Sequence, residues 1–374
     1  MIRVVFIIRS LEAGGAERQL VQLATNLDKS RFDVSVVTYY TGGQFADELT
    51  QIRGVRLFSA NKRGRYDTLM FLFRLFRIIR GLRPHIVHGY MWGANELASL
   101  LGIFTNAKVV WGIRASNIEF GHYDAAFSLL GRTGAWFSSS ADLIIANSKA
   151  GRAHHLALGY QSSSIRVIPN GIDIDRFLPV PAARARIRGE WGLLVDAIAV
   201  GIVGRLDPMK DHETFFKAAK LVAEALPAAR FIVVGGGNDN FRAGLQRLVS
   251  ELGLSNHVVW AGARRDMPEV YSALDVAISA SAFGEGFSNA IGEAMACGVP
   301  CVATDVGDAA DIMGDCGRLV PPRDADRLAA AIVATIGSDR PVIGRRSRER
   351  IAANFSGGAL ADRTGAALAA LMTS

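Results

Sequence analysis

Two carboxylates, Glu285 and Glu293, lie eight positions apart in the stretch FGEGFSNAIGEAMACGVP (283–300). The pattern predicts a loop of small residues and then a helix that begins near Ser288, a plausible N-cap, and ends at Gly298. The free amides and the positive dipole end of such a helix form an anion site suited to a phosphate. Glu285 would precede the helix, and Glu293 would lie about one and a half turns inside it, at roughly 3.6 residues per turn. The two acids could then accept hydrogen bonds from hydroxyl groups on either side of a bound phosphate.

Two other interpretations of this acid pair stay open. Glu285 could be a solvated loop acid and Glu293 a helix surface charge, because most charged side chains are simply solvated. A glycosidase carboxylate pair is the other alternative, but two acids around one helix start leave no evident room for a glycan between them.

Two cations flank a proline in a second segment, VGIVGRLDPMKD (200–211), which indicates a strand, a loop and a helix that opens at Asp211. The fixed φ of Pro208 would hold the loop in shape. Arg205 and Lys210 could grip a diphosphate from both sides, one as a fork and the other as a point charge. Basic loop residues are common, so this pair is a weak signal when taken alone.

A glycine pair stands in a third segment, IIRSLEAGGAERQL (7–20), which also indicates a strand, a loop and a helix. Gly14 and Gly15 would let the backbone approach a ligand closely beside the N-terminus of the helix. The segment matches neither the GxGxxG fingerprint nor a Walker loop.

The elements that must position these residues follow from apolar, β-rich runs that alternate with helical stretches, the pattern of an α/β fold with parallel sheets. The runs are 4–8, 34–38, 55–58, 85–88, 108–111, 143–146, 165–169, 198–203, 230–234, 257–260, 275–279 and 299–303. Continuous apolar runs suit strands that are buried on both faces. We therefore expect two doubly wound, Rossmann-like parallel-sheet domains, 1–175 and 176–355, that face a cleft. A linker is expected over 171–196, and a C-terminal helix over 356–374 is expected to pack back on the first domain.

The positive charge is concentrated in the first half of the chain. Residues 1–180 carry 21 Lys and Arg against 13 Asp and Glu, whereas residues 181–374 carry 21 against 22. Nine basic residues and one acid fall within 51–83, where TLMFLFRLFRIIRGLR repeats arginine every third residue among apolar ones. Such a helix would have a basic stripe beside an apolar face, which suits an anionic membrane or a lipid diphosphate acceptor. An ordinary helix that covers the sheet is the alternative, and nucleic acid fits poorly because no aromatic stacking motif accompanies the charges.

The three cysteines, Cys297, Cys301 and Cys316, are odd in number and show no CxxC spacing. They are typical of reduced thiols in a cytosolic protein and not of a disulfide framework or zinc site. No run reaches the ~18 apolar residues of a spanning helix. We expect a cytoplasmic protein, with peripheral attachment to the inner face of the plasma membrane left open.

The chain resembles the family 4 retaining glycosyltransferases of GT-B fold, also called group 1. The resemblance rests on the motifs GGAER (14–18), PNGID (169–173), GRLDPMKD (204–211) and EGFSNAIGEAMACGVPCVATDVG (285–307), which occur in the right order along nearly the whole chain. The last motif, with Glu285 and Glu293 as the E-x7-E pair, is highly specific, while GGAER and PNGID are supporting.

The resemblance implies roles for particular residues and a first domain on the acceptor side. Glu285 would contact the donor sugar near its anomeric carbon, Glu293 would hold the ribose hydroxyls, and Arg205 and Lys210 would bind the diphosphate. The resemblance thus implies Glu285, Arg205 and Lys210 as catalytic residues. It implies, as substrate-binding positions, Gly14, Gly15, Arg114, Arg264, Phe287, Ser288, Asn289 and Glu293. It implies no metal and no other cofactor.

The chain departs from the family pattern after the fifth expected strand, KVVWGIRASN, where many members place a histidine near the donor sugar. Arg114 occupies the matching position here. His88 and His122 are other candidates for the cleft wall, although a structural role is the more common one for a lone histidine.

The expected activity is therefore metal-independent transfer of a hexose or N-acetylhexosamine, with retention, from a nucleoside diphosphate sugar. A UDP-sugar is the first donor to consider, and a lipid-linked or polysaccharide acceptor would fit cell-surface glycan assembly. A nucleotide-sugar epimerase of the same fold and a non-catalytic nucleotide- or glycan-binding protein remain alternatives.

Overall fold

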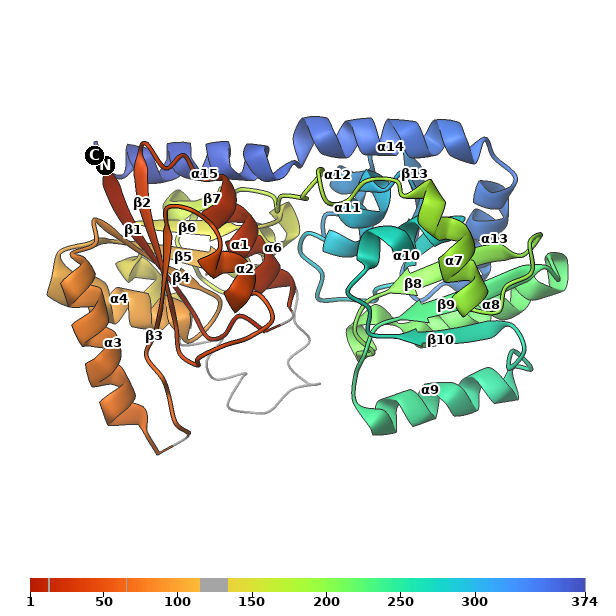
Figure 1. Ribbon diagram of the computed structural model, residues 1–374, viewed down its shortest axis with the longest axis horizontal. Helices are drawn as coiled ribbons and strands as arrows, with labels where there is room; N and C mark the ends of the chain where they lie inside the picture. The colour runs from red at the N-terminus through yellow and green to blue at the C-terminus, as the bar shows by residue number, and fades with distance from the viewer. Residues whose placement is uncertain (13, 65, 115–133, 374) are drawn as a thin grey trace. The chain divides into compact units, whose positions relative to one another are not determined.

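The computed structural model describes residues 1–12, 14–64, 66–114 and 134–373. Contacts between residues divide the chain into two compact units (Figure 1). The first, here the N-unit, comprises residues 1–171 and 357–374, and the second, the C-unit, comprises residues 172–356.

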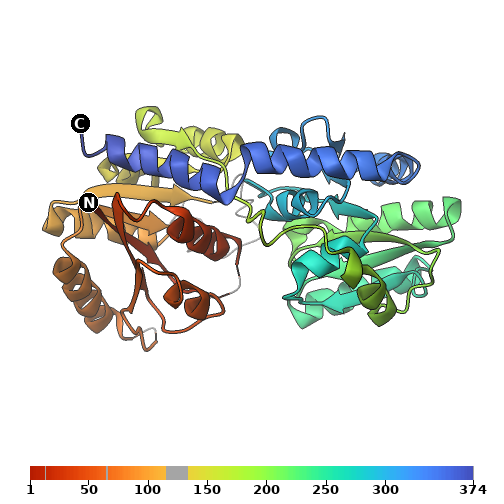
Figure 2. The ribbon, with the colours of Figure 1, turned by 45° about the horizontal axis from the view of Figure 1, so that its top comes forward.

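The N-unit is built on a seven-stranded parallel sheet with the strand order β3-β2-β1-β4-β5-β6-β7. The strands are β1 (Ile2–Ile8), β2 (Phe32–Thr38), β3 (Val55–Ser59), β4 (Ile86–Tyr90), β5 (Lys108–Ile113), β6 (Leu143–Ala146) and β7 (Ile165–Val167). The helices are α1 (Gly15–Asn26), α2 (Ala46–Thr50), α3 (Thr68–Leu82), α4 (Ala94–Thr105), α6 (Lys149–Ala157) and α15 (Gly357–Ala370), with 3-10 turns at Ser138–Ser140 and Ser162–Ser164. The C-terminal helix α15 packs against α1, so the last residues of the chain belong to this unit (Figure 2).

The C-unit is built on a six-stranded parallel sheet with the strand order β10-β9-β8-β11-β12-β13. The strands are β8 (Ile198–Val203), β9 (Ala229–Val234), β10 (Val258–Gly262), β11 (Val276–Ser279), β12 (Cys301–Thr304) and β13 (Gly317–Val320). The helices are α7 (Pro181–Glu190), α8 (His212–Ala225), α9 (Asp239–Glu251), α10 (Met267–Ala273), α11 (Asn289–Ala296), α12 (Ala309–Met313), α13 (Ala325–Ile336) and α14 (Arg340–Asn354), and a 3-10 turn spans Pro208–Lys210.

The predicted fold class, two doubly wound parallel-sheet domains, is confirmed. Each of the twelve apolar runs contains or overlaps a strand, because alternate residues of one run enter different cores on the two faces of the sheet. In β1, Val4, Phe6 and Ile8 lie in one buried cluster, whereas Val5 and Ile7 lie in another. The sequence missed β13, a short edge strand in which Arg318 and Leu319 are exposed.

The segment expected as a linker holds a helix instead. Residues 172–196 belong to the C-unit, where α7 packs on α10 and Ile187 is fully buried. Arg184 and Arg188 of this helix bind Asp275 at 2.8 and 3.1 Å, and Arg340 binds the same carboxylate at 2.8 Å. These ion pairs join residues that are far apart in the sequence, and such contacts leave little signal in a local sequence pattern. The sequence pattern therefore missed this helix.

The strand order of each sheet reverses between the first and fourth of its strands. These strands are β1 and β4 in the N-unit and β8 and β11 in the C-unit. Ligands of doubly wound sheets bind outside the carboxyl ends of the strands at such a switch point. No helix of the described residues is long and apolar enough to cross a membrane.

Candidate functional site

The loop after β8 is held in shape by two capping aspartates. Asp207 accepts a hydrogen bond from the Met209 amide at 3.0 Å, and Asp211 accepts one from the Thr214 amide at 3.1 Å as the N-cap of α8. The helix thus starts where the sequence predicted. The loop between the two caps presents Lys210 beside the carboxyl end of β11.

Lys210 forms an ion pair with Glu285, which follows β11. The side chains of Lys210 and Glu285 are 18% and 10% exposed, so the pair is largely shielded from water. Ser281 donates a second hydrogen bond to the same carboxylate oxygen at 2.9 Å. Burial by itself raises the pKa of Glu285, but the charge of Lys210 and the two hydrogen bonds outweigh it and hold the pKa below its usual value. Glu285 is therefore a buried, ionised acid, and the solvated-loop interpretation is wrong.

Arg205 differs from Lys210 because its side chain is 74% exposed. Its nearest described acid is Asp207, at 3.8 Å. Coulomb attraction from Arg205 also contributes to the low pKa of Glu285, so the guanidinium lies within electrostatic range of this carboxylate. The two cations that the sequence singled out thus have different environments, one committed to an internal pair and the other directed to solvent.

The helix α11 begins at Asn289, with Ser288 at the N-cap position that the sequence predicted. The Ser288 hydroxyl does not cap the helix, however, and this buried oxygen has no hydrogen-bond partner among the described residues. Asn289 is half-buried, whereas Phe287 is buried and its ring lies tilted against that of Phe355, with 5.4 Å between the ring centres. The Phe287 side chain therefore belongs to the core, and only its backbone could meet a ligand.

Glu293 is half-buried within α11, and Tyr271 of α10 donates a hydrogen bond to its carboxylate at 3.0 Å. Burial, followed by the negative charge of Glu293, raises the pKa of Tyr271 well above its usual value, so the phenol stays protonated as a donor. Glu293 is thus held in place by a neighbouring helix and is not a solvated surface charge.

Arg264 follows β10, and its guanidinium is bound to acidic side chains of the protein itself. It binds Asp266 at 2.6 Å and Glu190 at 3.0 Å. These bonds fix the loop after β10, so any ligand contact in this segment would fall to the backbone.

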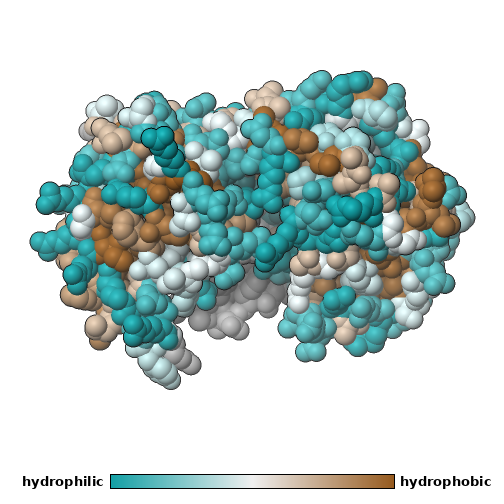
Figure 3. All heavy atoms as spheres, in the orientation of Figure 1, coloured by the Kyte–Doolittle hydropathy of each residue, from teal (hydrophilic) through white to brown (hydrophobic). Residues whose placement is uncertain are grey.

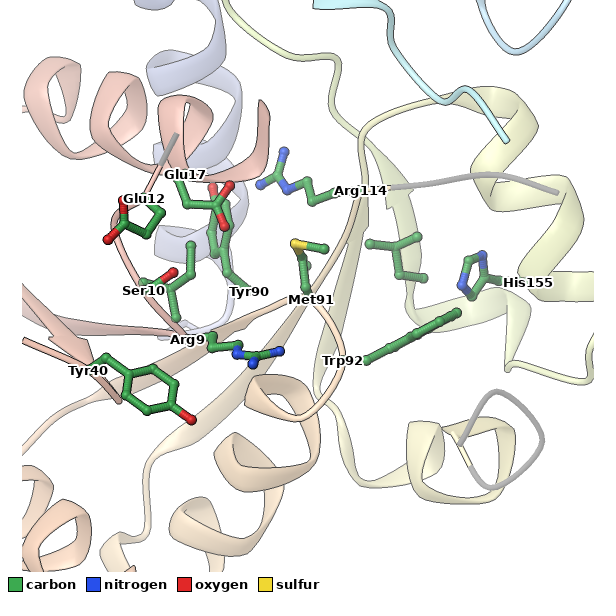
Figure 4. Close-up of a pocket in the computed structure, with 13 residues that line it drawn as sticks. Arg9, Ser10, Glu12, Glu17, Tyr40, Tyr90, Met91, Trp92, Arg114 and His155 are labelled. Atoms are coloured by element: carbon green, nitrogen blue, oxygen red, sulfur yellow. The ribbon is translucent and has the colours of Figure 1, made fainter. Parts of the chain in front are cut away.

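The N-unit has a pocket of about 630 Å³ at the carboxyl ends of β1, β4 and β5 (Figure 4). Figure 4 shows Ser10, Glu12 and Glu17 at one side of the pocket and Trp92 with His155 at the other. The lining residues are Ile8, Arg9, Ser10, Glu12, Glu17, Tyr40, Tyr90, Met91, Trp92, Gly112, Ile113, Arg114 and His155. The pocket combines both signs of charge with aromatic surfaces, which suits a ligand rich in hydroxyl groups.

Arg114 lines this pocket, with its guanidinium 4.3 Å from the centre of the Tyr90 ring. It donates a hydrogen bond to Asn170, a residue of the PNGID motif, at 3.2 Å, and its buried Nε has no partner within the described ranges of the chain. His88 is fully buried beside Phe6 at 5.1 Å between ring centres. His88 is not among the described residues that line the pocket, and neither of its ring nitrogens has a hydrogen-bond partner among the described residues. His122 lies outside the described residues.

The glycine pair marks the start of α1, which begins at Gly15 with Gly14 as its N-cap. Gly14 has an extended φ of −161°, which any residue adopts. A Cβ on Gly14 would meet the carboxylate of Glu17 at 2.0 Å, so this glycine gives space to the folded-back glutamate. Glu17 and Arg9, which the sequence did not single out, lie in the same pocket.

Sequence reasoning missed the partners that fix the site. Ser281 binds Glu285 four positions away within one loop, a contact that the sequence analysis did not consider. Tyr271 gave no signal, because it meets Glu293 only after α10 and α11 have packed. The described residues contain no group of three or more His, Cys, Asp or Glu that could hold a metal ion. The C-unit thus combines an exposed cation, a paired cation, a helix N-terminus and two fixed carboxylates at the switch point of its sheet. This arrangement can bind an anion that carries hydroxyl groups on both sides.

Comparisons with known proteins identify the family that the two halves of the chain match. Residues 13–176 match the family described as "Glycosyltransferase Family 4", and residues 197–338 match the family described as "Glycosyl transferases group 1". A GDP-mannose-dependent alpha-(1-6)-phosphatidylinositol monomannoside mannosyltransferase of Mycolicibacterium smegmatis is 29% identical, over 68% of this chain and 69% of the relative. A D-inositol 3-phosphate glycosyltransferase of the same organism is 26% identical, over 92% of this chain and 83% of the relative.

Solved structures share the fold. Anabaena Alr3699/HepE in complex with UDP and glucose has a TM-score of 0.86 at 23% identity, over 99% of this chain and 100% of that one. Sucrose-phosphate synthase from Thermosynechococcus elongatus has a TM-score of 0.82 at 23% identity, over 100% of both chains.

Proposed function

Since the chain belongs to the family 4, group 1 glycosyltransferases, we propose that it transfers a sugar from a nucleoside diphosphate sugar with retention of configuration. A UDP-hexose or UDP-N-acetylhexosamine is the first donor to test. GDP-mannose is the competing donor, because the mannosyltransferase relative is GDP-mannose-dependent.

The donor diphosphate is assigned to the C-unit, between the loop after β8 and the start of α11. Arg205 offers an exposed guanidinium, Lys210 offers an ammonium in the same loop, and α11 offers its first amides. The observation that carries this assignment is the buried Ser288 hydroxyl at the N-terminus of the helix, which has no hydrogen-bond partner in the part of the chain that the structure describes. A buried hydroxyl without a partner is destabilising, and a phosphate oxygen would accept its hydrogen bond.

The nucleoside is assigned to the region beside Glu293 and the loop after β10. The carboxylate of Glu293 would accept hydrogen bonds from the ribose hydroxyls, with Tyr271 holding it in orientation. The base would contact backbone atoms near Arg264, because the guanidinium of that residue already binds Asp266 and Glu190.

The leaving diphosphate gains negative charge as the glycosidic bond of the donor breaks. Arg205, Lys210 and the helix dipole together place positive charge where this charge develops, which is the main way that proteins stabilise such a transition state. We propose on this basis that transfer needs no metal ion. Glu285 would contact the donor sugar near its anomeric carbon and would also keep Lys210 in position.

The acceptor is assigned to the N-unit pocket, beside the loop that holds Gly14 and Gly15. Arg114 would contribute to this wall in place of the histidine of many family members. We propose a lipid-linked or polysaccharide acceptor and a cytoplasmic location at the inner face of the membrane, supported by the basic segment 51–83 and by three buried, free cysteines.

Incubation with UDP-, GDP- and ADP-sugars tests this proposal. Thermal shift identifies the nucleotide that binds, and NMR of the transferred or hydrolysed sugar reports its anomeric configuration, with and without EDTA. Arg205→Ala should lose nucleoside diphosphate affinity about tenfold or more, since hydrogen bonds to charged groups are worth ~1.5–3 kcal/mol. Arg247→Ala, an equally exposed change on α9, should not. A product of inverted configuration would contradict retention, and a strict metal requirement would contradict metal-independent transfer. An epimer as the sole product, or binding without turnover, would contradict sugar transfer itself.

A further inference from the structure

The helices α3 and α4 present an unusual set of exposed side chains on the outer side of the N-unit sheet. Figures 1 and 2 show α3 at the outer side of the N-unit, beside the sheet, and its contacts with α4 join the two helices. In Figure 3, apolar atoms gather at the left of the view, over α3 and α4, with hydrophilic atoms beside them. We call this the α3–α4 surface and define it by the apolar residues Leu69, Met70, Phe73, Leu100, Ile103 and Phe104 with the basic residues Arg77, Arg80 and Arg83.

One face of α3 fully accounts for its packing on the sheet. Phe71, Leu75 and Ile79 recur at helical spacing and are buried. Leu69 and Phe73 lie on the opposite face at i and i+4, yet they are 83% and 59% exposed. The apolar character of this second face therefore serves no internal contact of α3 that the structure describes.

The second helix extends this apolar surface. In α4, Leu100, Ile103 and Phe104 share one face and are 45%, 72% and 62% exposed. Phe76 of α3 meets Phe104 edge to face at 5.8 Å. A groove of about 260 Å³ runs between the helices, and its described lining is made of leucine and phenylalanine side chains alone.

The arginines divide into one that serves the fold and three that do not. Arg74 binds Asp67 at 2.5 Å and donates to the Ala60 carbonyl at 2.8 Å, so it ties the helix to the preceding loop. Arg77, Arg80 and Arg83 are exposed and form no described ion pair. Arg77 and Arg80 lie in the last two turns of α3, and Arg83 is its C-cap residue. The three arginines line depressions that also contain Phe73, Phe76 and Phe104, next to the apolar groove.

We propose that the α3–α4 surface inserts shallowly into an anionic lipid bilayer, with the apolar side chains among the acyl chains and the three arginines at the lipid phosphates. Apolar and cationic groups side by side match the two layers of a membrane interface. A second copy of the chain fits less well, because a symmetric contact would bring the same arginines face to face. This inference deepens the proposed membrane location and is independent of the proposed chemistry.

An environment-sensitive label tests the insertion directly. The cysteines of the protein are buried, so a single introduced cysteine can be labelled with NBD. Ile103→Cys places the label on the α3–α4 surface, and Val195→Cys places it on a fully exposed loop of the C-unit. With phosphatidylglycerol vesicles at low salt, the label at position 103 should shift to the blue and be quenched by acyl-chain nitroxides, while the label at position 195 should not change.

Charge variants test the role of the arginines. Replacing Arg80 and Arg83 by glutamine should weaken vesicle partitioning about 30-fold, at ~1 kcal/mol for each charge near the surface. The matched control, Arg247→Gln with Arg318→Gln, removes the same charge from exposed positions of the C-unit and should leave binding within about twofold. Thermal unfolding without ligand serves as the folding check, and the melting temperature should stay unchanged in both double variants.

Three results would overturn the inference. They are no co-sedimentation with anionic vesicles at low salt, sedimentation with no change of the label at position 103, and equal loss of binding in both arginine pairs. Binding to an acidic soluble protein but not to vesicles would likewise reject the membrane. Because no sugar nucleotide enters these assays, their failure leaves the glycosyltransferase proposal untouched, and the failure of sugar transfer leaves the α3–α4 surface untouched.

Discussion

Replacing Lys210 by methionine should destabilise the C-unit and change how its stability depends on pH. The substitution keeps the length of the side chain but leaves Glu285 without its cation. Because the two side chains are only 18% and 10% exposed, this pair belongs with buried ion pairs and not with surface pairs of about 0–1 kcal/mol. Removal of one partner of a buried pair typically costs about 3–5 kcal/mol. Some water reaches both groups, and Ser281 keeps its bond to Glu285, so we expect about 3 kcal/mol at pH 7.5.

The pH dependence follows from the pKa of Glu285. In the parent protein this pKa is depressed, so the stabilisation by Glu285 is present above the unfolded value of about 4.3 and is lost as pH falls through the folded value. Without Lys210, burial dominates and the pKa of Glu285 should rise above about 4.3. The variant should then lose stability as pH rises through this window, because its folded state binds more protons than its unfolded state.

Urea unfolding between pH 4.5 and 7.5 measures both effects. Lys217→Met is the matched control, since Lys217 pairs with Glu213 on exposed α8 surface and should cost no more than about 0.5 kcal/mol. Adding Glu285→Gln to Lys210→Met should recover part of the stability, while nucleoside diphosphate affinity stays low. If Lys210→Met unfolds at the same urea concentration as the parent and with the same pH profile, the buried pair has been assigned wrongly.

Three further sets of substitutions test the nucleotide site and the contacts that hold the C-unit together. Glu293→Gln should raise the donor KM about tenfold with kcat nearly unchanged, because an amide accepts hydrogen bonds from ribose hydroxyls more weakly than a carboxylate does. Tyr271→Phe, which only removes the hydrogen bond to the Glu293 carboxylate, should raise the donor KM less. Equal kinetics in the parent protein and both variants would show that Glu293 does not bind the ribose. Asp275→Ala should destabilise the C-unit by about 3–5 kcal/mol at pH 7 in urea unfolding, because it leaves three arginines without their common partner. Backbone bonding and the arginines hold the pKa of Asp275 below its usual value despite burial, so this difference should shrink as pH falls through that value; a constant difference would contradict it. Gly235→Ala should destabilise the C-unit strongly, because its Cβ would lie 1.8 Å from the Gly204 carbonyl oxygen, and an unchanged melting temperature would show that the two strand ends can separate.

The strands and their order along the chain were accessible from the sequence. A strand buried on both faces needs apolar residues at every position, and this requirement leaves a continuous run such as VVFII in β1. The start of α8 was also accessible, because its N-cap Asp211 binds an amide only three residues further on. The start of α11 was predicted at the right position, although the Ser288 hydroxyl does not cap the helix. Motif spacing likewise placed Arg205 and Lys210 together, because they belong to one loop.

Only the tertiary structure determined which of the site residues contact one another. Lys210 and Glu285 are 75 positions apart, and their ion pair exists because β8 and β11 are neighbours in the sheet. Strand order is a property of packing that no local pattern states. Nothing in the sequence therefore indicated that Lys210 pairs with an acid while Arg205 remains in solvent. The hydrogen bond from Tyr271 to Glu293 likewise depends on tertiary packing, because it requires α10 to lie beside α11.

The α3–α4 surface of the N-unit shows the same difference between what a local sequence pattern predicts and what packing determines. The arginine repeat over 68–83 is a local pattern, and it predicted a helix with a basic stripe beside apolar residues. Only packing could decide that Arg74 is bound internally while Arg77 and Arg80 remain in solvent. The sequence determined which residues each element carries, because local geometry and burial demand particular side chains. Tertiary packing determined which of those side chains meet, because contacts between distant elements depend on how the sheets and helices assemble.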